Sequence, residues 1–185
     1  MLNEEQLIKR CRKKDGNAQK LLFERYAGLL LGVCLRYATD SSEAEDILQE
    51  GFVKVFFKIG DYSGTGSFYN WMRKIMINTA ITNYYKTRKH RFQFDIEEVD
   101  EMEIDKVNLK ESDFTHKELL KVISELPEGY RVVFNLHAIE GFKHKEIAGI
   151  LNIDINTSKS QYSRARRVIR RKLVELSRIS KVKDE

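Results

Sequence analysis

The near absence of helix breakers is the feature that most constrains the fold of this chain. Its 185 residues contain a single proline, Pro127, and ten glycines, so long stretches hold nothing that interrupts an α-helix. Hydrophobic residues make up 42% of the chain, which suits a folded protein and argues against wholesale disorder. The sequence therefore predicts an all-α protein, with room for one medium domain or two small ones.

The charge distribution divides the chain into three parts. The net charge is +5, which permits an anionic partner, but residues 91–113 contain nine acidic and only three basic side chains. This acidic stretch has weak hydrophobic periodicity, so we expect an extended linker; the alternative is a surface helix with a solvated face. We therefore predict two small helical domains, residues 1–92 and 114–185, joined by an acidic linker at residues 93–113.

Composition also argues against several classes of protein. The best apolar run, residues 27–35, is far shorter than the roughly 20 residues of a membrane span, and residues 1–10 lack an apolar signal core. We therefore expect a cytoplasmic protein without membrane insertion. Cys11 and Cys34 have no CxxC spacing, and the four histidines do not combine with them at metal-ligand spacing. We expect no metal and no other cofactor.

Residues 141–167 have the layout of a helix-turn-helix. A short helix over 143–151 offers a small apolar face, a polar turn follows, and Asn156 or Thr157 would cap a second, basic helix. Its N-terminal end carries donors and acceptors that can reach base edges, and its later arginines can hold the DNA backbone. The alternative is a surface helix that is basic only for solubility. A helix-turn-helix alone does not identify the class of regulator.

A helix that begins near Asp40 carries apolar residues on two sides. One stripe, from Ala44 to Ile59, fits a core. Val53 and Phe57 lie on another side, and the acidic character of that helix makes it a poor DNA surface. Such a face suits protein docking; the alternative is that both sides are buried.

The next segment, residues 61–89, combines a glycine-rich loop with interleaved aromatic and basic side chains. Aromatic rings can stack on unpaired bases while the cations neutralise phosphates, and a loop of this kind can hold a flipped base. The alternative places the aromatic rings in the core, and we favour it for Trp71 alone. Tyr84 and Tyr85 are harder to bury.

These three motifs, in this order, resemble an extracytoplasmic-function (ECF) sigma factor of the sigma-70 superfamily. Residues 42–59 resemble the helix that docks on the clamp helices of RNA polymerase. Residues 68–88 resemble the element that melts and reads the −10 promoter element, and residues 141–167 resemble the helix-turn-helix that reads the −35 element. The resemblance implies a factor that binds core RNA polymerase and promoter DNA, directs promoter-specific initiation, and has a cognate anti-sigma factor.

The resemblance also implies roles for individual residues. The residues expected to dock on the polymerase are Asp46, Gln49, Glu50, Val53 and Phe57. Those expected to bind the −10 region are Gly66, Ser67, Phe68, Tyr69, Asn70, Trp71, Lys74, Asn78, Tyr84, Lys86 and Arg88. Those expected to bind the −35 region are Lys143, Lys145, Thr157, Ser158, Lys159, Ser160, Gln161, Ser163, Arg164 and Arg167.

Two positions depart from the family pattern. Gly51 stands where the family usually has a larger apolar residue, and a glycine inside a helix costs about 1 kcal/mol. We therefore expect a softened docking helix. Asn83 takes a place often held by aspartate, so the −10 assignments around it are less direct.

Two other functions compete with this interpretation. A stand-alone helix-turn-helix regulator would bind duplex DNA without polymerase, but it leaves the acidic-apolar helix and the aromatic-basic segment unused. An enzyme acting on nucleic acid would need a constellation that the sequence lacks: paired carboxylates at metal-site spacing, a Gly-Lys-Ser/Thr phosphate loop, or a nucleophile beside a base. We therefore predict a protein without a catalytic site.

Overall fold

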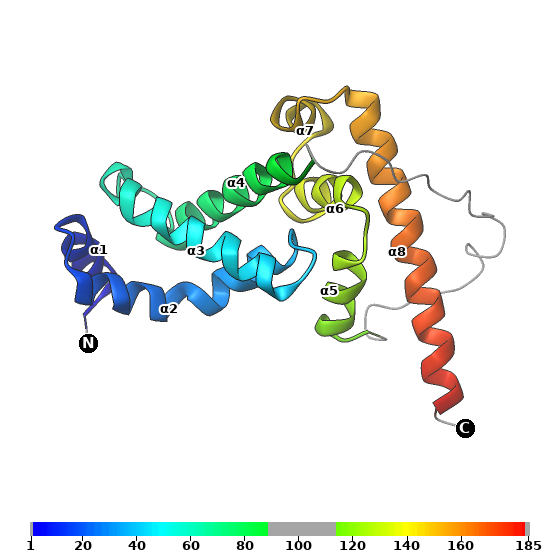
Figure 1. The fold of residues 1–185 in the computed structure, drawn as a ribbon, viewed down its shortest axis with the longest axis horizontal. Coiled ribbons are helices and arrows are strands. Elements are labelled where there is room, and N and C mark those ends of the chain that lie inside the picture. Colours follow the sequence, from blue (N-terminus) through cyan, green and yellow to red (C-terminus); the bar gives the residue numbers. More distant parts are fainter. Residues whose placement is uncertain (1, 89–113, 184–185) are drawn as a thin grey trace. The chain divides into compact units, whose positions relative to one another are not determined.

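The computed structural model describes residues 2–88 and 114–183, and within these ranges the chain forms helices and loops without strands (Figure 1). The described residues fall into two compact units. We call residues 2–88 the N-terminal unit and residues 114–183 the C-terminal unit, and each is described by itself. The predicted acidic linker at 93–113 and the predicted boundary at residue 92 lie outside the described residues. No helix in the described ranges is long and apolar enough to span a membrane.

The N-terminal unit is a small helical bundle. Helices α2, α3 and α4 pack against one another, and α1 packs on α2 (Figure 1). The elements are α1 (Glu4–Arg12), α2 (Gly16–Leu35), α3 (Ser41–Lys58), the short 3₁₀ turn η1 (Ile59–Asp61) and α4 (Phe68–Arg88).

Side-chain caps set where these helices begin. The Asp15 carboxylate accepts the backbone N–H of Ala18 at 3.1 Å, and the Asp40 carboxylate accepts that of Glu43 at 2.9 Å. Each cap satisfies a helix N–H that has no partner inside the helix. The predicted helix start near Asp40 is therefore confirmed.

At Gly51, α3 packs directly against Met76 of α4. A Cβ atom at this position would lie 2.1 Å from the sulfur of Met76, whose side chain is fully buried. The glycine thus makes room for a methionine of the neighbouring helix. The helix-propensity cost of Gly51 is therefore linked to close packing against Met76. The sequence alone did not indicate this contact.

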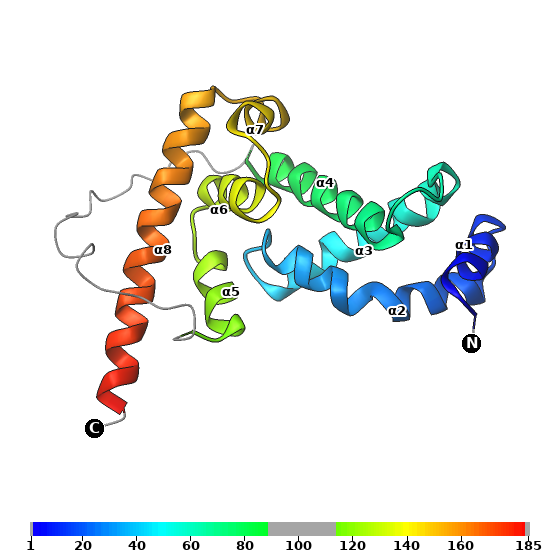
Figure 2. The same cartoon turned by 180° about the vertical axis from the view of Figure 1, so that it is seen from behind.

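The C-terminal unit is built around one long helix. Helices α5, α6 and α7 all contact α8, as Figure 2 shows from behind. The elements are α5 (His116–Ser124), α6 (Glu128–Phe134), the π-helical turn η4 (Asn135–Ile139), α7 (His144–Leu151) and α8 (Ile155–Lys183). After α6 the helical path continues into this wider turn, where the Glu140 N–H reaches back to the Asn135 carbonyl at 2.9 Å.

A buried arginine joins α5 to α6. The Arg131 side chain is 1% exposed, and its Nη1 donates to the carbonyl oxygens of Ser124 at 2.7 Å and Leu126 at 3.2 Å. These carbonyls lie where α5 has ended, so the guanidinium satisfies acceptors that have no helical partner. A charged residue in this core was not predicted from the sequence.

The turn between α7 and α8 is short and tight. Asn152 ends α7 in the left-handed conformation, with φ of 44°, and the Ile153 N–H returns to the Ala148 carbonyl at 3.1 Å. The next residue, Asp154, accepts the Asn156 N–H on its carboxylate at 2.7 Å. Helix α8 therefore begins at Ile155, and our prediction of a start at Asn156 or Thr157 is wrong by one or two residues.

Candidate nucleic-acid interface

The outward face of α3 exposes two apolar side chains in its C-terminal half. The side chains of Val53 and Phe57 are 62% and 89% exposed, while the opposite stripe, including Phe52 and Val55, is buried. The alternative that both faces are buried is therefore wrong.

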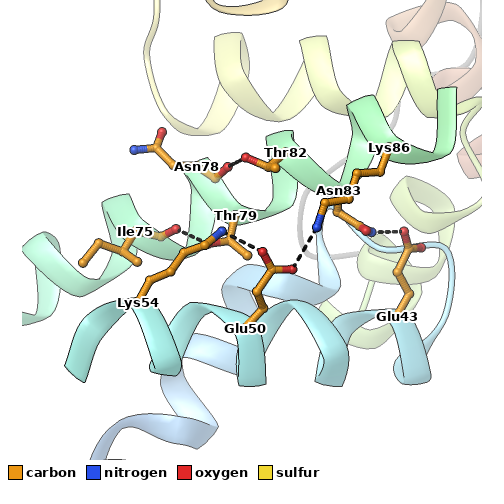
Figure 3. Close-up of polar contacts among 9 residues, drawn as sticks. All are labelled: Glu43, Glu50, Lys54, Ile75, Asn78, Thr79, Thr82, Asn83 and Lys86. Carbon is orange, nitrogen blue, oxygen red and sulfur yellow. Dashed lines mark hydrogen bonds and ion pairs between the residues drawn. The ribbon is translucent and has the colours of Figure 1, made fainter. Parts of the chain in front are cut away.

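Beside this face, Glu50 forms an ion pair that joins α3 to α4. Its carboxylate lies 2.8 Å from Lys54 Nζ, one turn along α3, and 3.5 Å from Lys86 Nζ on α4 (Figure 3). Lys54 also donates to the Thr79 hydroxyl at 3.2 Å. The hydrogen bond from Lys54, with a smaller contribution from Lys86, lowers the pKa of Glu50. Two lysines, one on each helix, are therefore held against a carboxylate of α3.

A hydrogen bond joins the start of α3 to α4. The Asn83 side chain donates from Nδ2 to Glu43 at 2.8 Å, as drawn in Figure 3. Glu43 also accepts the N–H and hydroxyl of Thr39 at 2.7 and 2.6 Å. An aspartate at position 83 would set two carboxylates against each other, so the amide fits this neighbour better. This contact gives the second departure from the family pattern a physical reason.

The loop before α4 is shaped by two glycines and a tyrosine. Gly64 and Gly66 have φ values of 81° and 75°, a conformation that favours glycine. The Tyr62 hydroxyl donates to the Gly66 carbonyl at 2.7 Å, which holds the loop in place. Under it, the rings of Phe68 and Trp71 stack with centroids 5.5 Å apart. Trp71 is half-buried, so part of the ring is open to a ligand.

The residues predicted for −10 binding divide by burial. Gly66, Ser67, Asn70, Lys74, Asn78 and Lys86 are exposed, Tyr69 and Trp71 are half-buried, and Phe68 and Tyr84 are buried. The expectation that Tyr84 is hard to bury is wrong, since it is only 8% exposed. The physical reason is helical register: Phe68, Met72, Met76, Ala80 and Tyr84 recur every fourth residue on the inner face of α4. The side chain of Arg88 lies outside the described residues.

The residues predicted for −35 binding come from α8, from α7 and from just before α7. Lys143, Lys145, Lys159, Ser160, Ser163 and Arg164 are exposed, and Thr157, Gln161 and Arg167 are half-buried. Ser158 is fully buried, with its hydroxyl 3.0 Å from Nδ1 of His144. The structure thus contradicts the placement of Ser158 on the DNA-facing side: it lies one turn before Tyr162, on the side of α8 that packs on the rest of the unit.

Sequence reasoning missed a cluster of aromatic rings beside Ser158. The rings of His137 and His144 stack with centroids 4.2 Å apart, and Tyr162 meets the His137 ring edge-on at 4.5 Å. Burial, followed by the charges of His137 and Lys159, lowers the pKa of His144. These residues come from η4, α7 and α8, so no spacing within one segment could have shown the cluster. Across the described ranges, no group of three or more His, Cys, Asp or Glu side chains could hold a metal ion.

Comparison with known proteins shows the family of this chain. The family models for sigma-70 region 2 and sigma-70 region 4 match residues 22–91 and 116–169. The RNA polymerase sigma-H factor of Pseudomonas aeruginosa is 30% identical over 186 residues, which cover 95% of this chain and 96% of that protein. The ECF RNA polymerase sigma-E factor of Escherichia coli K12 is 29% identical over 190 residues, covering 96% and 97%.

A solved complex of the sigma factor RpoE with the anti-sigma factor NepR from Bartonella quintana aligns with 83% of this chain and 95% of that chain, at 21% identity and a TM-score of 0.47. The two family models and the sigma-H relative define the class: the chain belongs to the sigma-70 superfamily of RNA polymerase sigma factors, and it is similar to sigma-E factors of the extracytoplasmic-function group. It directs promoter-specific initiation of transcription with core RNA polymerase.

Proposed function

We propose that the N-terminal unit docks on core RNA polymerase through the outward face of α3. The observation that carries this proposal is the exposure of Phe57 and Val53 on a helix whose opposite side is buried. Two neighbouring apolar side chains, one of them an almost fully exposed ring, gain free energy when a partner covers them. Asp46 and Gln49 are exposed on the same helix and would supply the polar rim, and the half-buried Glu50 borders it.

The loop from Gly64 and the first turns of α4 would hold the −10 element in its melted form. Asn70 and Asn78 are exposed amides that can pair with base edges, and Lys74 is an exposed cation between them. The half-buried Trp71 offers a ring face for an unpaired base. Phe68 and Tyr84 are buried, so they would not contact DNA directly but would support these side chains by packing.

The C-terminal unit would read the −35 element as duplex DNA. The first three turns of α8 expose Lys159, Ser160 and Arg164, the residue types that bind base edges and phosphates in a major groove. Lys143 and Lys145, exposed at the start of α7, would contact the backbone beside it.

The remaining assignments rest on family membership and on charge. Domains at 1–92 and 114–185 with an acidic tether at 93–113 would let each unit raise the effective concentration of the other at the promoter. A cognate anti-sigma factor is a third partner, and the cytoplasm, where RNA polymerase works, is the site of action. The chain itself would catalyse no reaction, because the polymerase supplies the chemistry.

Run-off transcription with core RNA polymerase on genomic promoter fragments tests this function. We expect discrete transcripts only when the chain is present, and loss of those transcripts when the −10 or the −35 block of an active fragment is replaced. A chain that shifts duplex DNA by itself and never supports initiation would instead be a stand-alone regulator.

A further inference from the structure

Ser158 lies in the first turn of α8, and its side chain points into the C-terminal unit. Its side chain has no exposed surface, and its hydroxyl oxygen lies 3.0 Å from Nδ1 of His144, the first residue of α7. A buried hydroxyl is costly without a partner, so this hydrogen bond specifies one orientation. The two helices of the helix-turn-helix are therefore joined by a polar contact at the end that would meet DNA.

This contact sets the rotation of α8 about its own axis. Consecutive residues of a helix are separated by about 100°, so an inward Ser158 turns its neighbours Thr157 and Lys159 toward the two sides of the DNA-facing surface. Ala165 is fully buried, and Tyr162 packs on the rings of Phe134 and His137, so apolar contacts already hold this part of α8. The hydrogen bond adds a directional contact at the N-terminal end of the helix.

His144 is itself held by the ring cluster. It stacks on His137, whose Nδ1 lies 2.8 Å from the Phe142 carbonyl oxygen, and Tyr162 packs against both histidines. The cluster thus links η4, α7 and α8 at the point where Ser158 is anchored.

We propose that Ser158 and His144 are positioning residues for −35 recognition: their hydrogen bond holds the base-reading side chains of α8 in register. This inference rests on the proposed role of α8 at the −35 element. Breaking the bond should reduce the discrimination between −35 sequences more than the total affinity for DNA, because phosphate contacts tolerate a rotation that base contacts do not.

The same geometry makes the register sensitive to pH. The ionisable groups on the elements around His144 are His137 on η4, Lys143 before α7, Lys145 and Glu146 on α7, and Lys159, Tyr162 and Arg166 on α8. Protonation of His144 would place a charge against the stacked His137 and close to Lys159, in a site that already lowers the pKa of His144. Discrimination should therefore fall as the pH drops below about 6.5, the ordinary value for histidine.

The test measures how well the holoenzyme discriminates between two DNA fragments: an active promoter found by run-off transcription, and the same fragment with its −35 block replaced. The ratio of the two affinities is the readout, with thermal melting as a check on folding. The variants are Ser158→Ala and His144→Leu, which remove the bond, and His144→Asn, whose amide can keep a hydrogen bond at the place of Nδ1 without titrating near neutral pH.

We expect Ser158→Ala and His144→Leu to lower the ratio about fivefold, with the affinity for the −35-replaced fragment unchanged. His144→Asn should keep the ratio between about pH 5.8 and 7.8, while the wild-type ratio falls toward that of Ser158→Ala at the acid end. An unchanged ratio in Ser158→Ala, or an equal loss in His144→Asn and His144→Leu, would overturn the proposal. A wild-type holoenzyme that does not distinguish the fragments at all would refute the −35 role of α8 itself.

Discussion

The two units hold the cations near their binding surfaces in different ways. In the N-terminal unit Lys54 and Lys86 are paired with Glu50, a carboxylate of the docking helix. In the C-terminal unit Lys159 and Arg164 form no ion pair with any residue that the structure describes, and the contact that orients their helix is the uncharged bond of Ser158. We infer that Glu50 keeps Lys54 and Lys86 from phosphates, whereas Lys159 and Arg164 are available to them.

The largest expected effect concerns the docking face. Val53→Asp with Phe57→Asp should weaken binding to core polymerase by tenfold or more, about 1.4 kcal/mol, because charged groups would replace apolar anchors. Melting should be unchanged, since both side chains are exposed. Fluorescence anisotropy of the labelled chain measures the affinity. Leu29→Asp on α2 is the matched control, because Leu29 is as exposed as Val53, at 62%. An equal loss in the control would break the assignment of docking to α3.

The next effect compares the stability of the two units after alanine replaces one helical glycine in each, Gly51 and Gly149. An added methyl group should gain up to about 1 kcal/mol of helix propensity at Gly149, where a Cβ meets nothing within 4 Å. At Gly51 the same methyl meets the buried Met76, so we expect Gly51→Ala to lower the free energy of unfolding by about 1–2 kcal/mol. Urea denaturation measures both. If Gly51→Ala stabilises as much as Gly149→Ala, the close approach of α3 and α4 is not specified by this glycine.

A smaller effect tests whether Glu50 neutralises the cations near α4. Glu50→Gln should raise the affinity of the free chain for a mixed-sequence single strand about two- to fivefold at low salt, and steepen its salt dependence by about one unit of slope. The reason is that Lys54 and Lys86 would be released to phosphates. Glu45→Gln removes the same charge from an exposed position of α3 and should have less effect. Equal responses would show that only net charge matters.

The smallest effect is a difference in pH dependence between the units. The pKa of His144 is lowered by burial, so its contribution to stability is present above pH 6.5 and is lost as the pH falls below that value. The pKa of Glu50 is lowered by its lysine partners, so its contribution persists until the pH falls below 4.5. Amide hydrogen exchange should therefore show protection weakening first around α7 and the start of α8. Weakening that begins in α3 and α4 would contradict this order.

Local signals explain which features could be predicted from the sequence. The helix starts at Asp15 and Asp40 follow from capping, which involves residues three positions apart. The burial of Ser158 and Tyr84 was not predictable in the same way, because it depends on which side of each helix meets its neighbours. The fit of Gly51 to Met76 joins residues on two different helices, so no single segment contains it.

The most direct test of the central claim combines protein and promoter substitutions in run-off transcription. The claim is that each unit reads its own promoter element. Arg164→Ala should reduce transcription from the intact promoter. It should cause no further loss when the −35 block is already replaced. When the −10 block is replaced instead, Arg164→Ala should lower the remaining transcription by the same factor as on the intact promoter. Asn78→Ala should show the reverse pattern. If both variants reduce transcription by the same factor on every template, neither residue reads its element, and the division of recognition between the two units is wrong.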